Sequence, residues 1–136
     1  MANEITLSQR LSASKSGGSV ANSLYSFSAD MAGSNMYHSM QEIDGDTPTT
    51  AAEAVVVGDV NTANDYWLFV RNMDATYDVL LALDSTHTTF TKQFAVIPPG
   101  KAAGPICIPG GATVYARNSS ALTEVTSDIE VVACEA

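Results

Sequence analysis

Residues 66–83, YWLFVRNMDATYDVLLAL, constrain the fold of this chain more than any other stretch. In a β-strand successive side chains point to opposite faces, so the apolar residues of 66–70 divide between both faces, and those of 77–83 do so too. The polar residues 72–76 between the two runs include an asparagine and an aspartate, which tolerate tight turns. Because apolar residues point to both sides, the sequence predicts a central β-hairpin that is covered on both faces. The core residues of this hairpin are expected to be Tyr66, Trp67, Leu68, Phe69, Val70, Val79, Leu81 and Leu83.

The rest of the chain repeats this pattern of short apolar runs separated by turn residues. Strong turn signals occur at residues 44–48, 98–100 and 109–111, where glycine, proline and aspartate gather. Helical periodicity is nearly absent, so we expect an all-β domain of nine to ten short strands, arranged as an antiparallel β-sandwich or a jelly roll. Pro105 interrupts the run 102–108 and predicts an edge strand or a bulge there.

The N-terminal end of the chain has a different composition. Ile5, Leu7 and Leu11 alternate with polar residues, which favours a strand or an extended arm, and the segment SKSGGS that follows is typical of a flexible linker. Two interpretations stay open: an edge strand of the domain with a loop, or an arm that adds a strand to a neighbouring subunit. The expected organisation is an arm and linker over residues 1–19 and one β-sandwich domain over residues 20–136. The candidate interface residues of the arm are Ile5, Leu7, Arg10 and Leu11.

The charge of the chain limits the classes of partner that we expect it to bind. Six basic residues face fifteen acidic ones, which gives a net charge of −9. Phosphate binding needs clustered lysines and arginines, whereas these are scattered, so we expect no nucleic-acid partner and no binding to anionic membranes. Only 15% of the residues are charged, which suits close contact with other proteins. The N-terminus has no basic and apolar leader, so we expect no signal peptide and synthesis in a cytoplasm.

The residues that could carry chemistry are few. His38 lies between Met36 and Met40 on one face of an expected strand, and His87 lies in a threonine-rich loop. No nucleophile motif accompanies either histidine, so we expect no enzyme. Loop aspartates could bind calcium, but their spacing matches no EF-hand, so they are interpreted as solvated acids and neither a metal nor a cofactor is expected. The aromatic residues could form a sugar-binding platform, but their alternation within strands favours core packing.

The two cysteines, Cys107 and Cys134, lie in apolar runs that are expected to be strands. They are interpreted as buried free thiols, which behave as small apolar side chains. A disulfide between the two strands is the alternative.

Four short motifs occur in the second half of the chain: WLFVRN at residues 67–72, VLLAL at 79–83, IPPG at 97–100 and VYAR at 114–117. A strand that ends in an asparagine turn, an apolar second strand, a proline-glycine turn and a late "YA" strand together resemble the small β-sandwich structural proteins of tailed bacteriophages. The resemblance covers residues 66–136. It implies a virion component, such as a capsid decoration (cement) protein, a neck or tail accessory, or a fibre-associated module.

From the residues and the resemblance together, we expect a virion structural protein, with capsid decoration as the first choice, that stabilises the particle through contacts between subunits. The expected partners are copies of the chain itself, in a homo-oligomer, and a major capsid or other virion protein. The alternatives are a neck, tail or fibre-associated structural protein and a receptor- or carbohydrate-binding module. The expected location is the virion, after synthesis in the host cytoplasm.

Overall fold

The computed structural model describes residues 5–9, 12–15, 18–21, 25–29, 35–45, 52–85, 92–122 and 125–136, and in these ranges the chain forms twelve strands and no helix. Four strands precede residue 30: β1 (Ile5–Gln9), β2 (Ser12–Lys15), β3 (Gly18–Ala21) and β4 (Tyr25–Ala29). Eight strands follow: β5 (Met36–Asp44), β6 (Glu53–Ala54), β7 (Tyr66–Asn72), β8 (Val79–Ala82), β9 (Gln93–Ile97), β10 (Ala102–Ile108), β11 (Tyr115–Asn118) and β12 (Thr126–Glu135).

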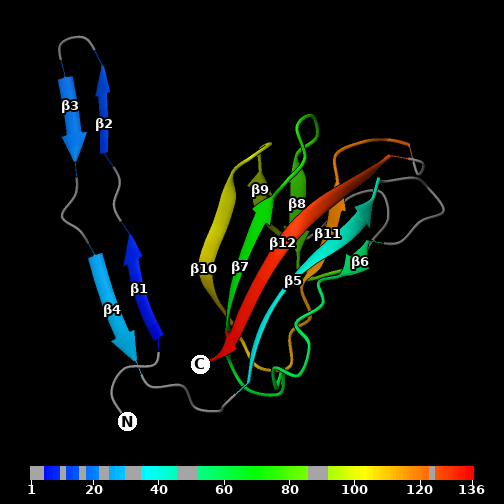
Figure 1. The fold of residues 1–136 in the computed structure, drawn as a ribbon. Helices are drawn as coiled ribbons and strands as arrows, with labels where there is room; N and C mark the ends of the chain where they lie inside the picture. The colour runs from blue at the N-terminus through cyan, green and yellow to red at the C-terminus, as the bar shows by residue number, and fades with distance from the viewer. Residues whose placement is uncertain are drawn as a thin grey trace.

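The eight later strands form two four-stranded antiparallel sheets, with strand orders β10-β7-β12-β5 and β6-β11-β8-β9. Figure 1 shows the two sheets packed face to face. The all-β class and the β-sandwich are therefore confirmed, with eight strands in the sandwich of the described chain rather than nine or ten.

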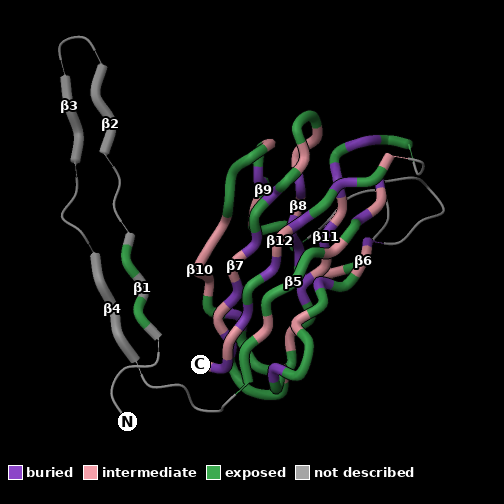
Figure 2. The backbone as a smooth tube through the Cα atoms, in the orientation of Figure 1, coloured by how far each residue is buried: buried purple, intermediate pink, exposed green. Residues whose placement is uncertain are grey.

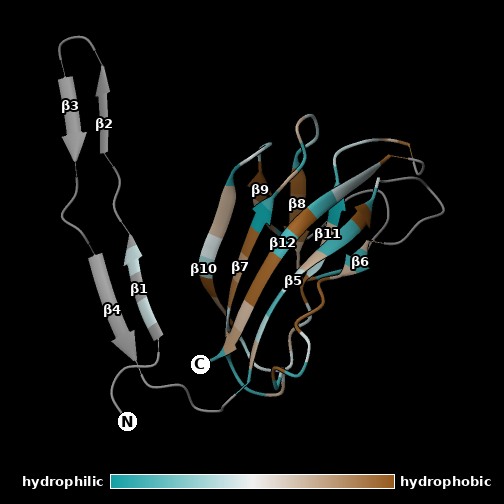
Figure 3. Ribbon diagram, viewed as in Figure 1, coloured by the Kyte–Doolittle hydropathy of each residue, from teal (hydrophilic) through white to brown (hydrophobic). Residues whose placement is uncertain are grey.

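Alternation along the strands places one side of each sheet in the core. In β7 the buried residues are Tyr66, Leu68, Val70 and Asn72, and in β12 every second side chain is likewise buried (Figure 2). Figure 3 shows the apolar segments of β7, β8 and β12 that supply much of this core. The core cluster consists of Ile43, Val55, Val60, Tyr66, Leu68, Val70, Val79, Leu81, Ile97, Ile108, Val114, Ala116, Ile129, Val131 and Ala133.

The prediction of a central hairpin over residues 66–83 is wrong. β7 pairs with β10 and β12, whereas β8 pairs with β9 and β11, so the two strands lie in opposite sheets. Residues 73–78 carry the chain from one layer to the other. A hairpin and a connection between layers both place alternate side chains toward a core, so periodicity alone does not separate them.

The expected core residues of this stretch divide into two groups. Tyr66, Leu68, Val70, Val79 and Leu81 are buried between the sheets. The others are not: Trp67 and Phe69 are half-buried on the outer side of their sheet, and Leu83 is 36% exposed just after β8.

The proline in β10 behaves as the sequence predicts. β10 is an edge strand, and its register with β7 shifts between Ala103 and Ile106. Gly104, beside Pro105, has a φ of 109°, and a Cβ atom there would lie 2.5 Å from the carbonyl oxygen of Leu68. Glycine therefore allows β10 to pass close to β7 at this bulge.

The four early strands form a two-stranded ribbon of their own. β1 pairs with β4, and β2 pairs with β3 in a register that sets Lys15 opposite Gly18. Part of the segment expected to be a flexible linker, residues 14–15 and 18–19, therefore belongs to β2 and β3. The ribbon extends to Ala29, beyond the expected boundary at residue 19, and the division into domains stays a prediction.

The candidate interface residues of the arm are only partly within the described chain. Ile5 and Leu7 belong to β1, where the backbone is described. Arg10 and Leu11 lie outside the described residues. Strand addition to a neighbour by these four residues stays a prediction.

Candidate interaction surface

The side of sheet β10-β7-β12-β5 that faces away from the core carries several exposed apolar side chains, and it is called the outer face below. Cross-strand pairing orders its side chains into rows. The first row contains Met36, Cys134, Trp67 and Cys107; the second contains His38, Val132 and Phe69; the third contains Met40, Glu130, Arg71 and Ala102.

The apolar part of the outer face is incompletely covered. Met36 is 73% exposed, Met40 is 51% exposed, and Val132 is 37% exposed. Trp67 and Phe69 beside them are only half-buried. A contiguous patch of this kind on a sheet is typical of a surface that contacts another chain or segment.

Glu130 occupies the centre of the third row. Its Oε1 atom lies 2.9 Å from Nε2 of His38, and its Oε2 atom lies 3.8 Å from Nη1 of Arg71. Both partners are largely solvent-exposed, so these ion pairs add little to stability. They do give the outer face a polar margin next to its apolar rows.

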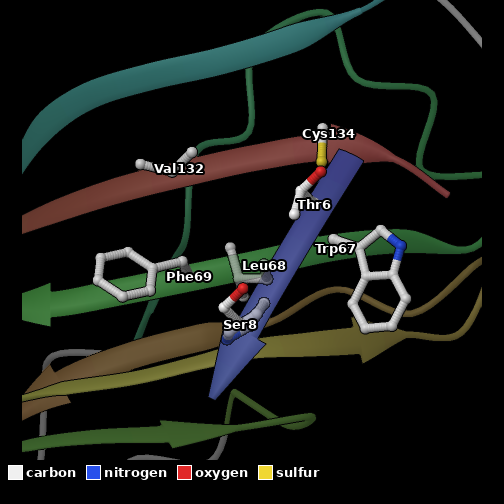
Figure 4. Close-up of a pocket in the computed structure, with 8 residues that line it drawn as sticks. Thr6, Ser8, Trp67, Leu68, Phe69, Val132 and Cys134 are labelled. Atoms are coloured by element: carbon white, nitrogen blue, oxygen red, sulfur yellow. The ribbon is translucent and has the colours of Figure 1, made fainter. Parts of the chain in front are cut away.

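Strand β1 of the ribbon lies against the outer face. A cavity of about 310 Å³ separates the strand from the sheet, and Figure 4 shows β1 passing over β7 and β12 at this site. The cavity is lined by Thr6, Ser8, Trp67, Leu68, Phe69, Pro105, Val132 and Cys134. The hydroxyl residues of β1 thus meet a mostly apolar floor and leave space unfilled, which makes the contact poorly complementary.

Both cysteines lie on the outer face, one on each side of Trp67 in the first row. They are free thiols, as the first interpretation held, and no disulfide joins them. Two strand spacings separate their backbones, about 9.5 Å, which exceeds the reach of a disulfide. The expected burial is wrong for Cys107, which is exposed, and Cys134 is half-buried.

Burial raises the pKa of both thiols. For Cys107 the negative charge of Asp65 raises the pKa further. A raised pKa lowers the thiolate fraction, so neither cysteine has the microenvironment of a reactive nucleophile.

Three buried polar side chains hold strand ends and loops in place. Asn72, at the end of β7, donates from Nδ2 to the carbonyl oxygens of Tyr77 and Ile97, each at 2.8 Å. Asn118, at the end of β11, donates from Nδ2 to the carbonyl oxygen of Val125 at 2.8 Å.

Glu135, at the end of β12, also holds neighbouring backbone segments in place. Its Oε1 atom accepts hydrogen bonds from Nδ2 of Asn35 at 3.1 Å and from the backbone N–H of Asn61 at 3.0 Å. The bonds made by these three side chains tie strand ends to loops. Burial of polar residues right at strand ends was not anticipated from the sequence, although an asparagine closing an apolar run is a visible signal.

The remaining titratable residues do not converge on one site. His38 lies on the outer face, whereas His87 and Asp46 lie outside the described residues. Within the described ranges, no three of the histidines, cysteines, aspartates and glutamates are grouped so that they could hold a metal ion.

Asp74 is hydrogen-bonded both within its own turn and to β12. It accepts hydrogen bonds from Ser127 Oγ at 2.7 Å and from the backbone N–H of Tyr77 at 2.9 Å. Burial alone would raise the pKa of Asp74, but these bonds and those from the N–H groups of Thr76 and Ala75 outweigh burial and lower the pKa.

Comparison with known proteins gives no relative: no family model matches the chain, and neither the curated proteins nor the solved structures include a significant match. No helix long and apolar enough to cross a membrane occurs in the part of the chain that the structure describes.

Proposed function

We propose that this chain is a structural subunit that assembles through its N-terminal ribbon, and that the assembly is the virion of a tailed bacteriophage. Decoration of the capsid is the first choice of position, and a neck, tail or fibre position is the alternative. The virion assignment is supported by the resemblance of residues 66–136 to phage β-sandwich proteins. The partners would be copies of the chain itself and a major capsid or other virion protein.

The observation that carries the assembly role is that the ribbon does not pair with any strand of the described sandwich. Strands β1 to β4 pair only with one another and add no strand to either four-stranded sheet. An isolated two-stranded ribbon is at best marginally stable in water, so it needs a surface to pack against. The contact with its own outer face leaves a cavity of about 310 Å³, which supports a second surface for the ribbon.

A neighbouring subunit supplies such a surface. Each copy offers a ribbon and an incompletely covered outer face, so one copy can present its ribbon to the outer face of the next. Each contact of this kind is weak, but many identical contacts in a shell act together because every subunit is already held near its partners.

The ribbon can be tested by removing it. A variant without residues 1–34 is expected to keep the β-sheet circular dichroism of the sandwich, because no sandwich strand is lost. Sedimentation velocity over a range of concentrations should show assemblies for the full chain and a smaller species for the variant. A full chain that remains monomeric throughout, or a variant that assembles equally well, would contradict the proposal.

The virion assignment needs its own measurement. Mass spectrometry of density-purified particles from the source of this sequence should detect peptides of the chain in a fixed ratio to the major capsid protein. Peptides found only in the soluble fraction would count against a virion position and leave the assembly role to be judged separately.

One observation favours carbohydrate binding as a second candidate. The ring of Trp67 lines the cavity together with the hydroxyl residues Thr6 and Ser8, a combination that suits stacking and hydrogen bonding to a sugar. A glycan array probed with the full chain and with Trp67→Ala tests this candidate. Binding that Trp67→Ala abolishes would support it, and an array without hits would exclude it.

A further inference from the structure

Strand β5 forms one edge of its sheet, and in the described chain only β12 pairs with it (Figure 1). The orientation of its backbone follows from bonds at its two ends. Gly45 donates to the carbonyl oxygen of Val125, and Asn35 accepts from the N–H of Glu135, so odd-numbered residues face β12. The N–H and C=O groups of the even-numbered residues 36–42 therefore point away from the sandwich.

Residues 53–56, which include the first described strand after residue 45, make no backbone bond to these groups, and the carbonyl oxygen of Met40 accepts a bond from Ser39 Oγ at 3.3 Å. Asp44 donates its N–H to Oε1 of Glu53, which closes the end of the edge. Along residues 54–56 the contact with β5 runs through the side chain of Gln41, which bonds to the carbonyl oxygen of Ala54 and the N–H of Val56, each at 2.9 Å. The backbone of residues 36–42 is not used by this segment.

Several features that protect a sheet edge are missing from β5. It is nine residues long and contains neither proline nor lysine, and its two acidic residues, Glu42 and Asp44, lie toward one end. The opposite edge of the same sheet, β10, is interrupted by a bulge and by Pro105. A long edge without a bulge or a proline is a template for pairing with another strand.

We propose that β5 pairs with β5 of a second copy, antiparallel, about a two-fold axis that passes through Met40 and perpendicular to the sheet. This contact is additional to the ribbon contact proposed above and does not depend on it. A two-fold axis in this direction keeps both outer faces on the same side and sets even-numbered residues opposite even-numbered residues.

The side chains of β5 favour this register over its neighbours. With Met40 opposite Met40, His38 lies opposite Glu42 of the second copy, and this polar pair occurs twice because of the symmetry. A shift by two residues in one direction sets Glu42 opposite Met36. The opposite shift sets Met40 opposite Glu42. In the centred register Asp44 lies opposite Met36, at the end of the paired segment, because the N–H of Asp44 already bonds to Glu53. Only the centred register pairs methionine with methionine and histidine with glutamate.

Disulfide cross-linking of the full chain tests the register directly. In a background of Cys107→Ser and Cys134→Ser, Met40→Cys should form a cross-linked dimer under mild oxidation. Its two Cα atoms would lie about 5.5 Å apart, which is within disulfide range. The matched control is Glu42→Cys on the same strand face, which would lie about 14 Å from its counterpart and should remain uncross-linked.

A charge pair provides the second test. Full chains that carry Met40→Lys or Met40→Glu should each capture less of a differently tagged copy of themselves than the unsubstituted chain does, because like charges would meet at the axis. Capture that remains would come from the ribbon contact. Mixing the two variants should restore the capture that each had lost. Equal cross-linking of Met40→Cys and Glu42→Cys, absence of any cross-link, or no rescue on mixing would overturn the proposal. Ribbon-dependent assembly would survive each of these results, so the two proposals can fail separately.

Discussion

Replacement of the buried Asn72 is expected to destabilise the sandwich more than any surface polar substitution. Asn72 is fully buried and makes three side-chain hydrogen bonds. Its Nδ2 atom donates to the carbonyl oxygens of Tyr77 and Ile97, each at 2.8 Å, and its Oδ1 atom accepts from the N–H of Asp74 at 2.9 Å. These bonds fix the connection from β7 to β8, which takes the chain from one sheet to the other.

The size of the effect follows from what Asn72→Ala leaves behind. The bond to Ile97 is buried, so its carbonyl oxygen loses its partner without access to water, which costs about 2 kcal/mol. The partners on Tyr77 and Asp74 are part-buried and regain some hydration, so each adds about 0.5 kcal/mol. The small cavity adds a little more, and the free energy of unfolding should fall by about 3–4 kcal/mol. Asn72→Asp should be at least as severe at neutral pH, because it turns a carboxylate oxygen toward two carbonyl oxygens.

Urea unfolding followed by the fluorescence of Trp67, on the same strand, measures this change. The matched control is Asn61→Ala, because Asn61 makes a similar turn bond to the N–H of Ala63 at 3.1 Å but is exposed. Its effect should stay below about 1 kcal/mol. If Asn72→Ala and Asn61→Ala reduce the free energy of unfolding equally, the argument from buried, unsatisfied carbonyl groups is wrong.

Two further predictions concern titratable groups. The hydrogen bonds to Asp74 lower its pKa in the folded state, so its contribution to stability is present above the ordinary value of 3.8 and is lost as the pH falls through the folded value. Asp74→Asn should therefore show a shallower loss of unfolding free energy between pH 5 and pH 3, in about the range where carboxylates titrate, and parallel pH curves for both proteins would refute this role. Alkylation with iodoacetamide at neutral pH should modify the exposed Cys107 before the half-buried Cys134, and both more slowly than a free cysteine, because their pKa values are raised. Peptide mass spectrometry reads out the order, and faster modification of Cys134 would contradict the placement of the two thiols.

The spacing of apolar residues predicted the fold class well, because neighbouring residues along one strand already show which of its faces is buried. Tyr66, Leu68 and Val70 are buried as their spacing indicates, and Pro105 lies at a bulge in an edge strand. The pairing of strands was harder to predict, because a strand with a two-sided apolar pattern does not specify its neighbours. Asn72 holds the connection over residues 73–78 by its bonds to Tyr77 and Ile97, and the bond to Ile97 joins groups that are distant in the sequence.

The candidate surface was visible in the sequence only in part. Met36, His38 and Met40 were expected on one strand face, and that face is the outer one. What the sequence could not show is the cross-strand register that sets Cys134 and Trp67 beside Met36. The sequence placed Trp67 and Phe69 in the core. An aromatic residue in a strand gives the same sequence pattern whether its face of the sheet is buried or only half covered.

The ribbon contact and the β5 edge contact use the same sheet, so the reach of the ribbon in a β5–β5 dimer follows from the strand spacing. Pairing of β5 with β5 of a second copy would join two four-stranded sheets and place their outer faces side by side. In the centred antiparallel register, Met36 would lie opposite Asp44 of the second copy and eight residue steps, about 27 Å, from the level of that copy's Met36. Trp67 of the second copy lies in the row of its Met36 and three strand spacings, about 14 Å, from β5 of the first copy, so it would be about 30 Å from Met36 of the first copy. The connection from Ala29 to Met36 spans seven residue steps and reaches at most about 25 Å, which falls short of that distance. The ribbon contact would therefore involve a different neighbour from the edge contact. Met40→Lys should then leave ribbon-dependent assembly intact, and removal of the ribbon should leave the Met40→Cys cross-link intact.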